Sequence, residues 1–122
     1  MASTKYKPLE QLSGWIEYKL DTDRLDPPVF RCRLRPITGL NMIDGAAGGE
    51  GFKLGRALQE AAIEAVAAWE LEADGAPLPL DPDTKRGWLL PILDQPVTGK
   101  PGVLLGIAIV ADATNRETFL KN

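Results

Sequence analysis

The sequence offers few of the side chains that enzymes commonly use for catalysis. No histidine is present among the 122 residues, which removes the commonest general base near neutral pH and the commonest metal ligand. A Ser-His or Cys-His pair therefore cannot be built within the chain. The single cysteine, Cys32, alternates with Phe30 and Leu34, and this pattern predicts a buried, unreactive thiol. We expect a non-enzymatic protein with no catalytic residue, no cofactor and no metal site.

A glycine-rich segment, residues 44–51 (D-G-A-A-G-G-E-G), invites comparison with a phosphate-binding loop. It lacks the lysine and hydroxyl of G-x-x-x-x-G-K-[ST], and no buried strand is predicted before it. Free amides at Gly48 and Gly49, ahead of a predicted helix, could still bind an anion. Because the segment costs backbone entropy to order and has few apolar groups to offset that cost, we predict a flexible loop.

Two charged clusters have both a structural and a functional interpretation. Asp74, Asp81 and Asp83 fit no EF-hand spacing, and Asp81 followed by proline predicts a helix cap in preference to a calcium site. Arginines recur at every second position of one predicted strand. This row could bind phosphates, contact an acidic partner, or form a solvated and partly ion-paired face. We favour the solvated face for this row of Arg31, Arg33 and Arg35.

The N-terminal third of the chain predicts an antiparallel hairpin. Residues 14–21 and 29–35 each alternate apolar and polar side chains, with a proline- and aspartate-containing connection between them. One face of the hairpin would bury Tyr18, Phe30 and Cys32. The other face would carry Glu17 and Lys19 beside the arginines, and their exposed ion pairs would contribute little next to the apolar face that sets the register.

Helices are predicted in the remainder of the chain. Residues 52–68 have an apolar stripe at three- and four-residue spacing, residues 82–88 form a short helix that ends before Pro91, and residues 103–113 are apolar nearly all round. The last run could also be a buried strand; as a helix it would continue towards Phe119. Between the first two helices, residues 69–80 are extended around an Asp74-Gly75 turn.

Together these elements predict a single α+β domain over residues 1–122. An N-terminal antiparallel β-hairpin packs with three to four helices and a short Trp-x-Leu, Asp-Gly, Pro-Leu-Pro extended turn unit, after a polar arm at residues 1–13. The net charge of −3 supplies no basic field for nucleic acid or anionic lipid, and no apolar run is long enough to span a bilayer. One cysteine and no signal-like N-terminus favour the cytosol.

Several short motifs resemble the small tail assembly chaperones of long-tailed bacteriophages. They are Trp69-x-Leu71, Asp74-Gly75-x-Pro77-Leu78-Pro79-Leu80, Asp81-Pro82-x-Thr84, Leu90-Pro91, and a final apolar segment with Leu104, Leu105, Ile107 and Ala108. The run Phe30-x-Cys32-x-Leu34-Arg35-Pro36-Ile37-Thr38 also resembles the strand before the first helix of such proteins. The resemblance is firmest over residues 52–110, and the chain departs from it at residues 44–51 and 89–101.

This resemblance implies a non-enzymatic protein of the host cytoplasm that binds the tape-measure protein, recruits tail-tube subunits and forms homo-oligomers. We expect the trio Trp15–Tyr18–Phe30 and the pair Trp69–Trp88 mainly in the core, although large aromatics also anchor partners. Candidate partner-binding residues are Trp69, Leu104, Ile107, Phe119, Arg31 and Arg33. The alternatives are a permanent structural virion protein (connector, tail terminator or decoration subunit) and a nucleotide-binding protein or small enzyme that uses the glycine loop.

Overall fold

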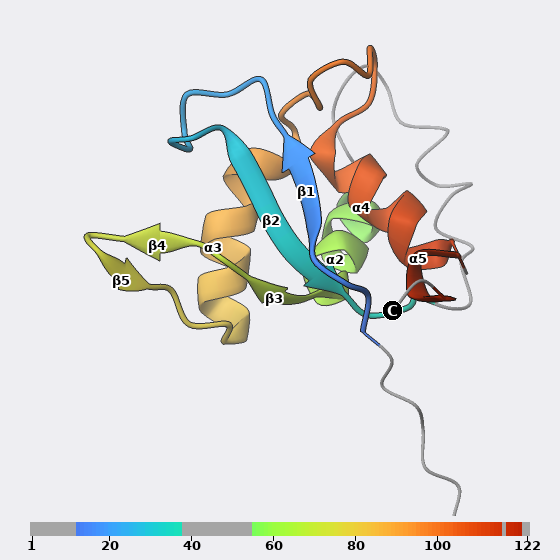
Figure 1. Cartoon of the computed structure of the whole chain (residues 1–122), viewed down its shortest axis with the longest axis horizontal. Coiled ribbons are helices and arrows are strands. Elements are labelled where there is room, and N and C mark those ends of the chain that lie inside the picture. Colours follow the sequence, from blue (N-terminus) through green and yellow to red (C-terminus); the bar gives the residue numbers. More distant parts are fainter. Residues whose placement is uncertain (1–11, 38–54, 116, 121–122) are drawn as a thin grey trace, which may run out of the picture.

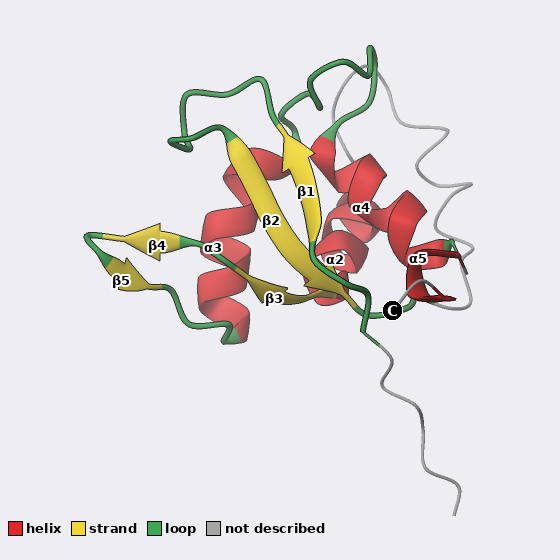
Figure 2. Cartoon of the chain, in the orientation of Figure 1, coloured by secondary structure: helices red, strands yellow, loops and turns green. Residues whose placement is uncertain are grey.

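The computed structural model describes residues 12–37, 55–115 and 117–120. In this part of the chain a three-stranded sheet of order β1-β2-β3 and a two-stranded sheet β4-β5 combine with four helices (Figures 1 and 2), which confirms the α+β class. The elements are β1 (Ile16–Lys19), β2 (Val29–Leu34), α2 (Arg56–Ala65), β3 (Val66–Trp69), β4 (Glu72–Ala73), β5 (Ala76–Pro77), α3 (Pro82–Leu93), α4 (Leu105–Thr114) and α5 (Glu117–Leu120). The predicted glycine loop at 44–51, with Gly48 and Gly49, and most of the predicted arm at 1–13 lie outside the described residues.

The predicted hairpin is confirmed as β1 and β2. The strands pair antiparallel, with Tyr18 opposite Phe30 and Glu17 opposite Arg31. Tyr18, Phe30 and Cys32 are buried, whereas Glu17 and Arg31 are exposed on the other face. The two-residue period of the sequence therefore decides which side of the sheet becomes core.

The helix predicted over residues 52–68 is wrong at its C-terminal end. Residues 52–54 are not described, α2 ends at Ala65, and Val66–Trp69 form β3, which pairs antiparallel with β2. The tertiary reason is that a strand here satisfies backbone groups on the open edge of β2 and buries both Val66 and Trp69. The register shifts between Arg33 and Leu34, as expected of a bulge where the new strand joins.

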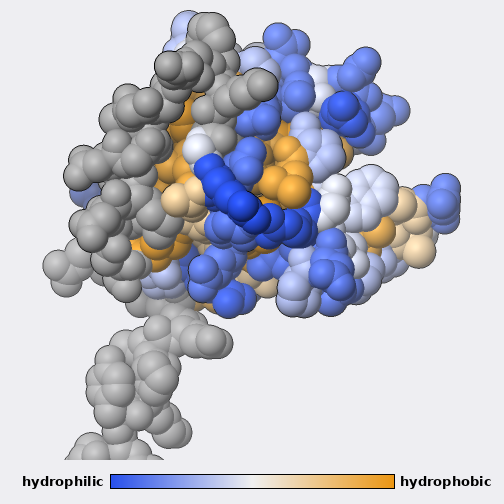
Figure 3. Space-filling model, turned by 180° about the vertical axis from the view of Figure 1, so that it is seen from behind, coloured by the Kyte–Doolittle hydropathy of each residue, from blue (hydrophilic) through white to orange (hydrophobic). Residues whose placement is uncertain are grey.

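Helices α2, α3 and α4 cover one face of the three-stranded sheet, and the β4-β5 hairpin projects from the body (Figure 1). Helices α2 and α4 contact each other, and the small side chains of Ala61, Ala62 and Ala65 on α2 are all buried. Small residues allow a close approach of the two helices. Viewed from the helix side, the described part shows separate hydrophobic patches between hydrophilic side chains (Figure 3).

The apolar run near the C-terminus is the helix α4 and not a buried strand. Leu105 and Ile109 are fully buried within the chain, whereas Ile107 remains exposed. The predicted continuation of this helix towards Phe119 is wrong, because α4 ends at Thr114 and a separate helix α5 starts at Glu117. The side chain of Asn115 accepts a hydrogen bond from the Glu117 amide at 3.0 Å, which favours the restart.

Pro91 does not end α3, contrary to the prediction that this helix would stop before it. The helix continues to Leu93, with Pro91 inside its last turn. A proline removes one intrahelical hydrogen bond, and near a helix end that loss affects little of the helix. Ile92 and Leu93 are both buried, so completing the turn adds apolar contacts to the core.

A partly buried hydrogen bond connects the sheet to the helical layer. The Tyr18 hydroxyl donates to Oδ2 of Asp112 on α4 at 2.6 Å. Burial, followed by the hydrogen bond and charge of Asp112, raises the pKa of Tyr18 far above its ordinary value, so the hydroxyl keeps its proton. On the outer side of the helices, Arg86 of α3 forms an ion pair with Glu60 of α2.

Asp81 caps α3 as the sequence predicts, and its ionisation gives the fold a dependence on pH. Its Oδ1 accepts from the Thr84 amide at 2.9 Å, and this hydrogen bond is the main cause that lowers the pKa of Asp81 below its usual 3.8. A carboxyl with a lowered folded-state pKa contributes stability above its unfolded-state pKa and loses that contribution as the pH falls through the lowered value. Asparagine also caps helices well but does not titrate.

We therefore expect Asp81→Asn to change the free energy of unfolding little at pH 7 and to flatten its decline below the ordinary pKa of 3.8. Urea unfolding at a series of pH values from neutral to strongly acidic measures this difference. Asp83→Asn, in the first turn of the same helix, is the control. An unchanged acid slope in the D81N variant would contradict a capping carboxylate.

Candidate protein-interaction groove

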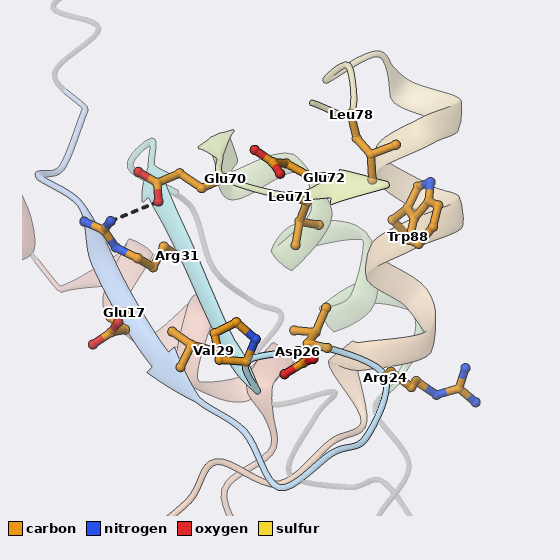
Figure 4. A pocket seen from close by; sticks show the side chains of 12 residues that line it. Glu17, Arg24, Asp26, Val29, Arg31, Glu70, Leu71, Glu72, Leu78 and Trp88 are labelled. Carbon is orange, nitrogen blue, oxygen red and sulfur yellow. Dashed lines mark hydrogen bonds and ion pairs between the residues drawn. The ribbon is translucent and has the colours of Figure 1, made fainter. Parts of the chain in front are cut away.

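Two adjoining hollows open where the β1–β2 loop, the segment after β3, and α3 meet. Figure 4 shows the side chains that line the larger one. The larger has a volume of about 420 Å³ and the smaller about 350 Å³. They share Arg24, Leu25, Leu71 and Trp88. We call the two hollows together the Trp88 groove; its remaining lining residues are Glu17, Asp26, Pro27, Val29, Arg31, Glu70, Glu72, Leu78, Gly87, Pro91 and Ile92.

One wall of the groove is built by the β4-β5 hairpin. Asp74 and Gly75 both have positive φ, at 54° and 79°, and form the two-residue turn that reverses the chain. This reversal brings the Leu78 amide within 2.9 Å of the Leu71 carbonyl. The indole Nε1 of buried Trp69 donates to the Leu78 carbonyl at 2.9 Å, so a core side chain holds the wall in position.

Apolar side chains form the part of the groove next to α3. Trp88 is 46% exposed, Leu25 and Leu78 are half-buried, and Leu71 is buried. Figure 4 shows Leu78 and Trp88 on the α3 side, with Leu71 facing the interior. A large aromatic ring that stays exposed beside leucines is a feature of protein-binding surfaces.

Carboxylates outnumber guanidinium groups along the rest of the groove. Glu17, Asp26, Glu70 and Glu72 line it together with Arg24 and Arg31. Arg31 Nη1 lies 2.9 Å from Glu70 Oε2, and its guanidinium carbon lies 5.6 Å from the centroid of the Trp15 ring. Within the described residues, the two ion pairs are this one and Arg86–Glu60, so no described basic side chain pairs with the other three carboxylates.

Most of the partner-binding residues predicted from the sequence lie elsewhere. Trp69, Leu104 and Phe119 are buried and belong to the core, whereas Ile107 is exposed on α4. Arg31 lines the groove, and Trp69 supports its wall from behind. Arg33 is half-buried, and its Nε donates to the Ser13 carbonyl at 2.8 Å, so this side chain is tied to the backbone next to β1.

The sequence interpretation missed Trp88 as a surface residue. The sequence predicts Trp15 and Trp88 mainly in the core, but they are 45% and 46% exposed. Because α3 continues through Pro91, its buried stripe consists of Leu89, Ile92 and Leu93. Trp88 lies at the margin of this stripe, beside Pro91. The sequence predicts this helix only to residue 88, so the position of Trp88 relative to the buried stripe could not be read from the pattern.

Cys32 is buried, as predicted. Cys32 lies in the central strand β2, between β1 and β3. Burial, with a smaller contribution from the Asp112 carboxylate, raises the pKa of its thiol to about 12. We expect no reaction with a thiol-specific disulfide reagent at pH 8 in the folded protein, and complete reaction in urea, because only the thiolate attacks. Absorbance of the released chromophore measures the reaction of the folded and of the unfolded protein. Fast labelling of the folded protein would contradict an enclosed thiol.

The described part of the chain is thus a small α+β domain with an open, partly apolar groove. Among its residues, no group of three or more His, Cys, Asp or Glu side chains is placed to hold a metal ion. None of its helices combines the length and apolar character that a bilayer crossing requires. Comparisons with protein-family models, curated proteins and solved structures find no match to this chain.

Proposed function

We propose that this protein is a non-enzymatic tail assembly chaperone of a long-tailed bacteriophage that binds its partner through the Trp88 groove. The observation that carries the proposal is the half-exposed Trp88 ring next to Leu25, Leu71 and Leu78. Aromatic rings set among apolar side chains account for much of the binding energy in protein interfaces. The phage assignment rests on the sequence resemblance, and its residues 69–80 supply one wall of the groove.

In this proposal the groove covers apolar segments of the tape-measure protein in the host cytoplasm until tail-tube subunits are recruited. A long helical protein with exposed apolar faces aggregates unless those faces are covered. Several copies of the chaperone, as a homo-oligomer or side by side on the tape-measure protein, would cover successive segments.

Co-expression with fragments of the tape-measure protein tests the proposal. Wild-type protein should keep at least one fragment in the soluble fraction, and Trp88→Ala should lose this effect. Trp15→Ala is a matched control, because Trp15 is as exposed as Trp88 but lies outside the groove lining. Fragment solubility that is independent of the co-expressed protein would contradict the proposed function.

Mass spectrometry of purified virions separates this proposal from a permanent structural role. A chaperone leaves the particle, so its peptides should be absent. A connector, tail terminator or decoration subunit would instead be present in a fixed ratio to the other tail proteins.

A further inference from the structure

We propose that the segment bound in the Trp88 groove is basic and amphipathic, with one large aliphatic side chain next to Trp88 and lysine or arginine beside it. The inference rests on the proposed function only in taking the groove as a protein-binding site. It does not depend on which protein the partner is. It follows from the separation of the groove into an apolar part and an acidic part.

The apolar part suits a single large side chain. The smaller hollow has a volume of about 350 Å³, at the low end of the range of about 300–1,000 Å³ for ligand pockets. Its apolar walls are the Trp88 ring, Leu25, Leu71, Pro91 and Ile92, and Gly87 and Arg24 complete the lining. A leucine, isoleucine or methionine side chain placed here would be covered on several sides, and a polar side chain would lose its hydration without a matching partner.

The acidic part favours a positive charge beside that anchor. Glu17, Asp26 and Glu72 line the larger hollow and have no ion-pair partner among the described residues, whereas Glu70 is already paired with Arg31. Arg24 also contributes to the lining, but its side chain points away from the groove interior (Figure 4). An acidic segment would be repelled, and a basic one would be attracted more strongly at low salt.

Gly87 provides a way to block the groove without removing a core group. It lines the smaller hollow on α3, and a Cβ added there would meet no atom within 4 Å. Replacing a helical glycine by a residue with higher helix propensity does not weaken the helix. Gly87→Leu should therefore fold and partly fill the hollow, and Gly87→Ala should fold and leave most of it open.

Fluorescence anisotropy with three labelled synthetic peptides tests the inference on the full chain. The peptides have the same length: one alternates leucine and lysine at helical spacing, one replaces lysine by glutamate, and one replaces leucine by serine. We expect the leucine–lysine peptide to bind at least about tenfold more tightly than either of the others, because the serine peptide lacks the apolar anchor and the glutamate peptide is repelled by the carboxylates. Its binding should weaken as salt is raised.

The variants assign this binding to the groove. Trp88→Ala and Gly87→Leu should each weaken the leucine–lysine peptide by about tenfold, whereas Trp15→Ala and Gly87→Ala should bind like the wild type. Glu72→Gln and Asp26→Asn should each weaken it by about two- to fivefold, the range for exposed ion pairs, and reduce its salt dependence. If Trp88→Ala fails to fold, Gly87→Leu alone decides the assignment.

Several results would overturn the inference: no binding of the leucine–lysine peptide, tighter binding of the glutamate peptide, or equal binding to the wild type and Gly87→Leu. Self-association that competes with the peptide and is lost in Gly87→Leu, measured by sedimentation velocity, would show a second copy in the groove and would also overturn it. Peptide binding without any effect on tape-measure fragments would reject the proposed function and leave the inference standing.

Discussion

Phe30→Ala is expected to lower the free energy of unfolding by about 3–5 kcal/mol, the range for deleting a buried aromatic ring. Phe30 lies in the central strand β2 opposite Tyr18, and its side chain is 0% exposed. The loss has two parts. The variant lacks the favourable free energy of transferring the ring from water to the core, and the surrounding core retains a cavity. Small domains are stable by about 5–15 kcal/mol, so this variant should be only marginally folded.

Urea unfolding followed by far-UV circular dichroism measures this effect. Phe30→Leu is the control, since it keeps most of the volume and should cost about 1–2 kcal/mol. An unchanged dependence of free energy on urea in both variants would show that the native and unfolded states keep their surface areas. Equal losses below about 1 kcal/mol in both variants would contradict an enclosed ring at the centre of the sheet.

Ile109→Ala should lower the free energy of unfolding by about 2–5 kcal/mol, whereas Ile107→Ala should change it by less than about 1 kcal/mol. The two residues have the same side chain in the same helix, α4, so helix propensity affects both equally. They differ in burial, because Ile109 is 0% exposed and Ile107 is 38% exposed. The comparison therefore isolates the contribution of tertiary packing at α4.

Both variants should be unfolded at a low and a high protein concentration. A loss at Ile107 that equals the loss at Ile109 and grows with concentration would indicate a subunit contact over α4, because association stabilises the folded state by mass action. A small loss at Ile107 that is independent of concentration would argue against a subunit contact over this part of α4.

The sequence by itself determined the N-terminal hairpin and its buried face. Alternation at every second residue places Tyr18, Phe30 and Cys32 on one side, and burial of that side fixes the register. It also determined where α3 starts, because the Asp81 cap is a local hydrogen bond between residues three positions apart. Such features depend on neighbours along the chain and need no knowledge of the rest of the fold.

Only the tertiary structure decided where α2 ends, how long α3 is, and which side chains of α4 are buried in the core. Val66–Trp69 have no strong local preference that outweighs the edge of β2, and Pro91 is tolerated because Ile92 and Leu93 gain core contacts. An apolar run such as that of α4 is compatible with a core and with an interface, since the same side chains suit both.

The candidate groove likewise could not be predicted from the sequence. Its lining comes from β1, β2 and the loop between them, from the segment after β3 with the β4-β5 hairpin, and from α3. A change in the length of any one of these elements would move the others relative to Trp88. The sequence showed which aromatic residues the chain has, and it placed Trp69 at the start of the extended segment 69–80. Packing decided that Trp69 is covered and Trp88 is open, because exposure depends on which distant segments fold over each ring.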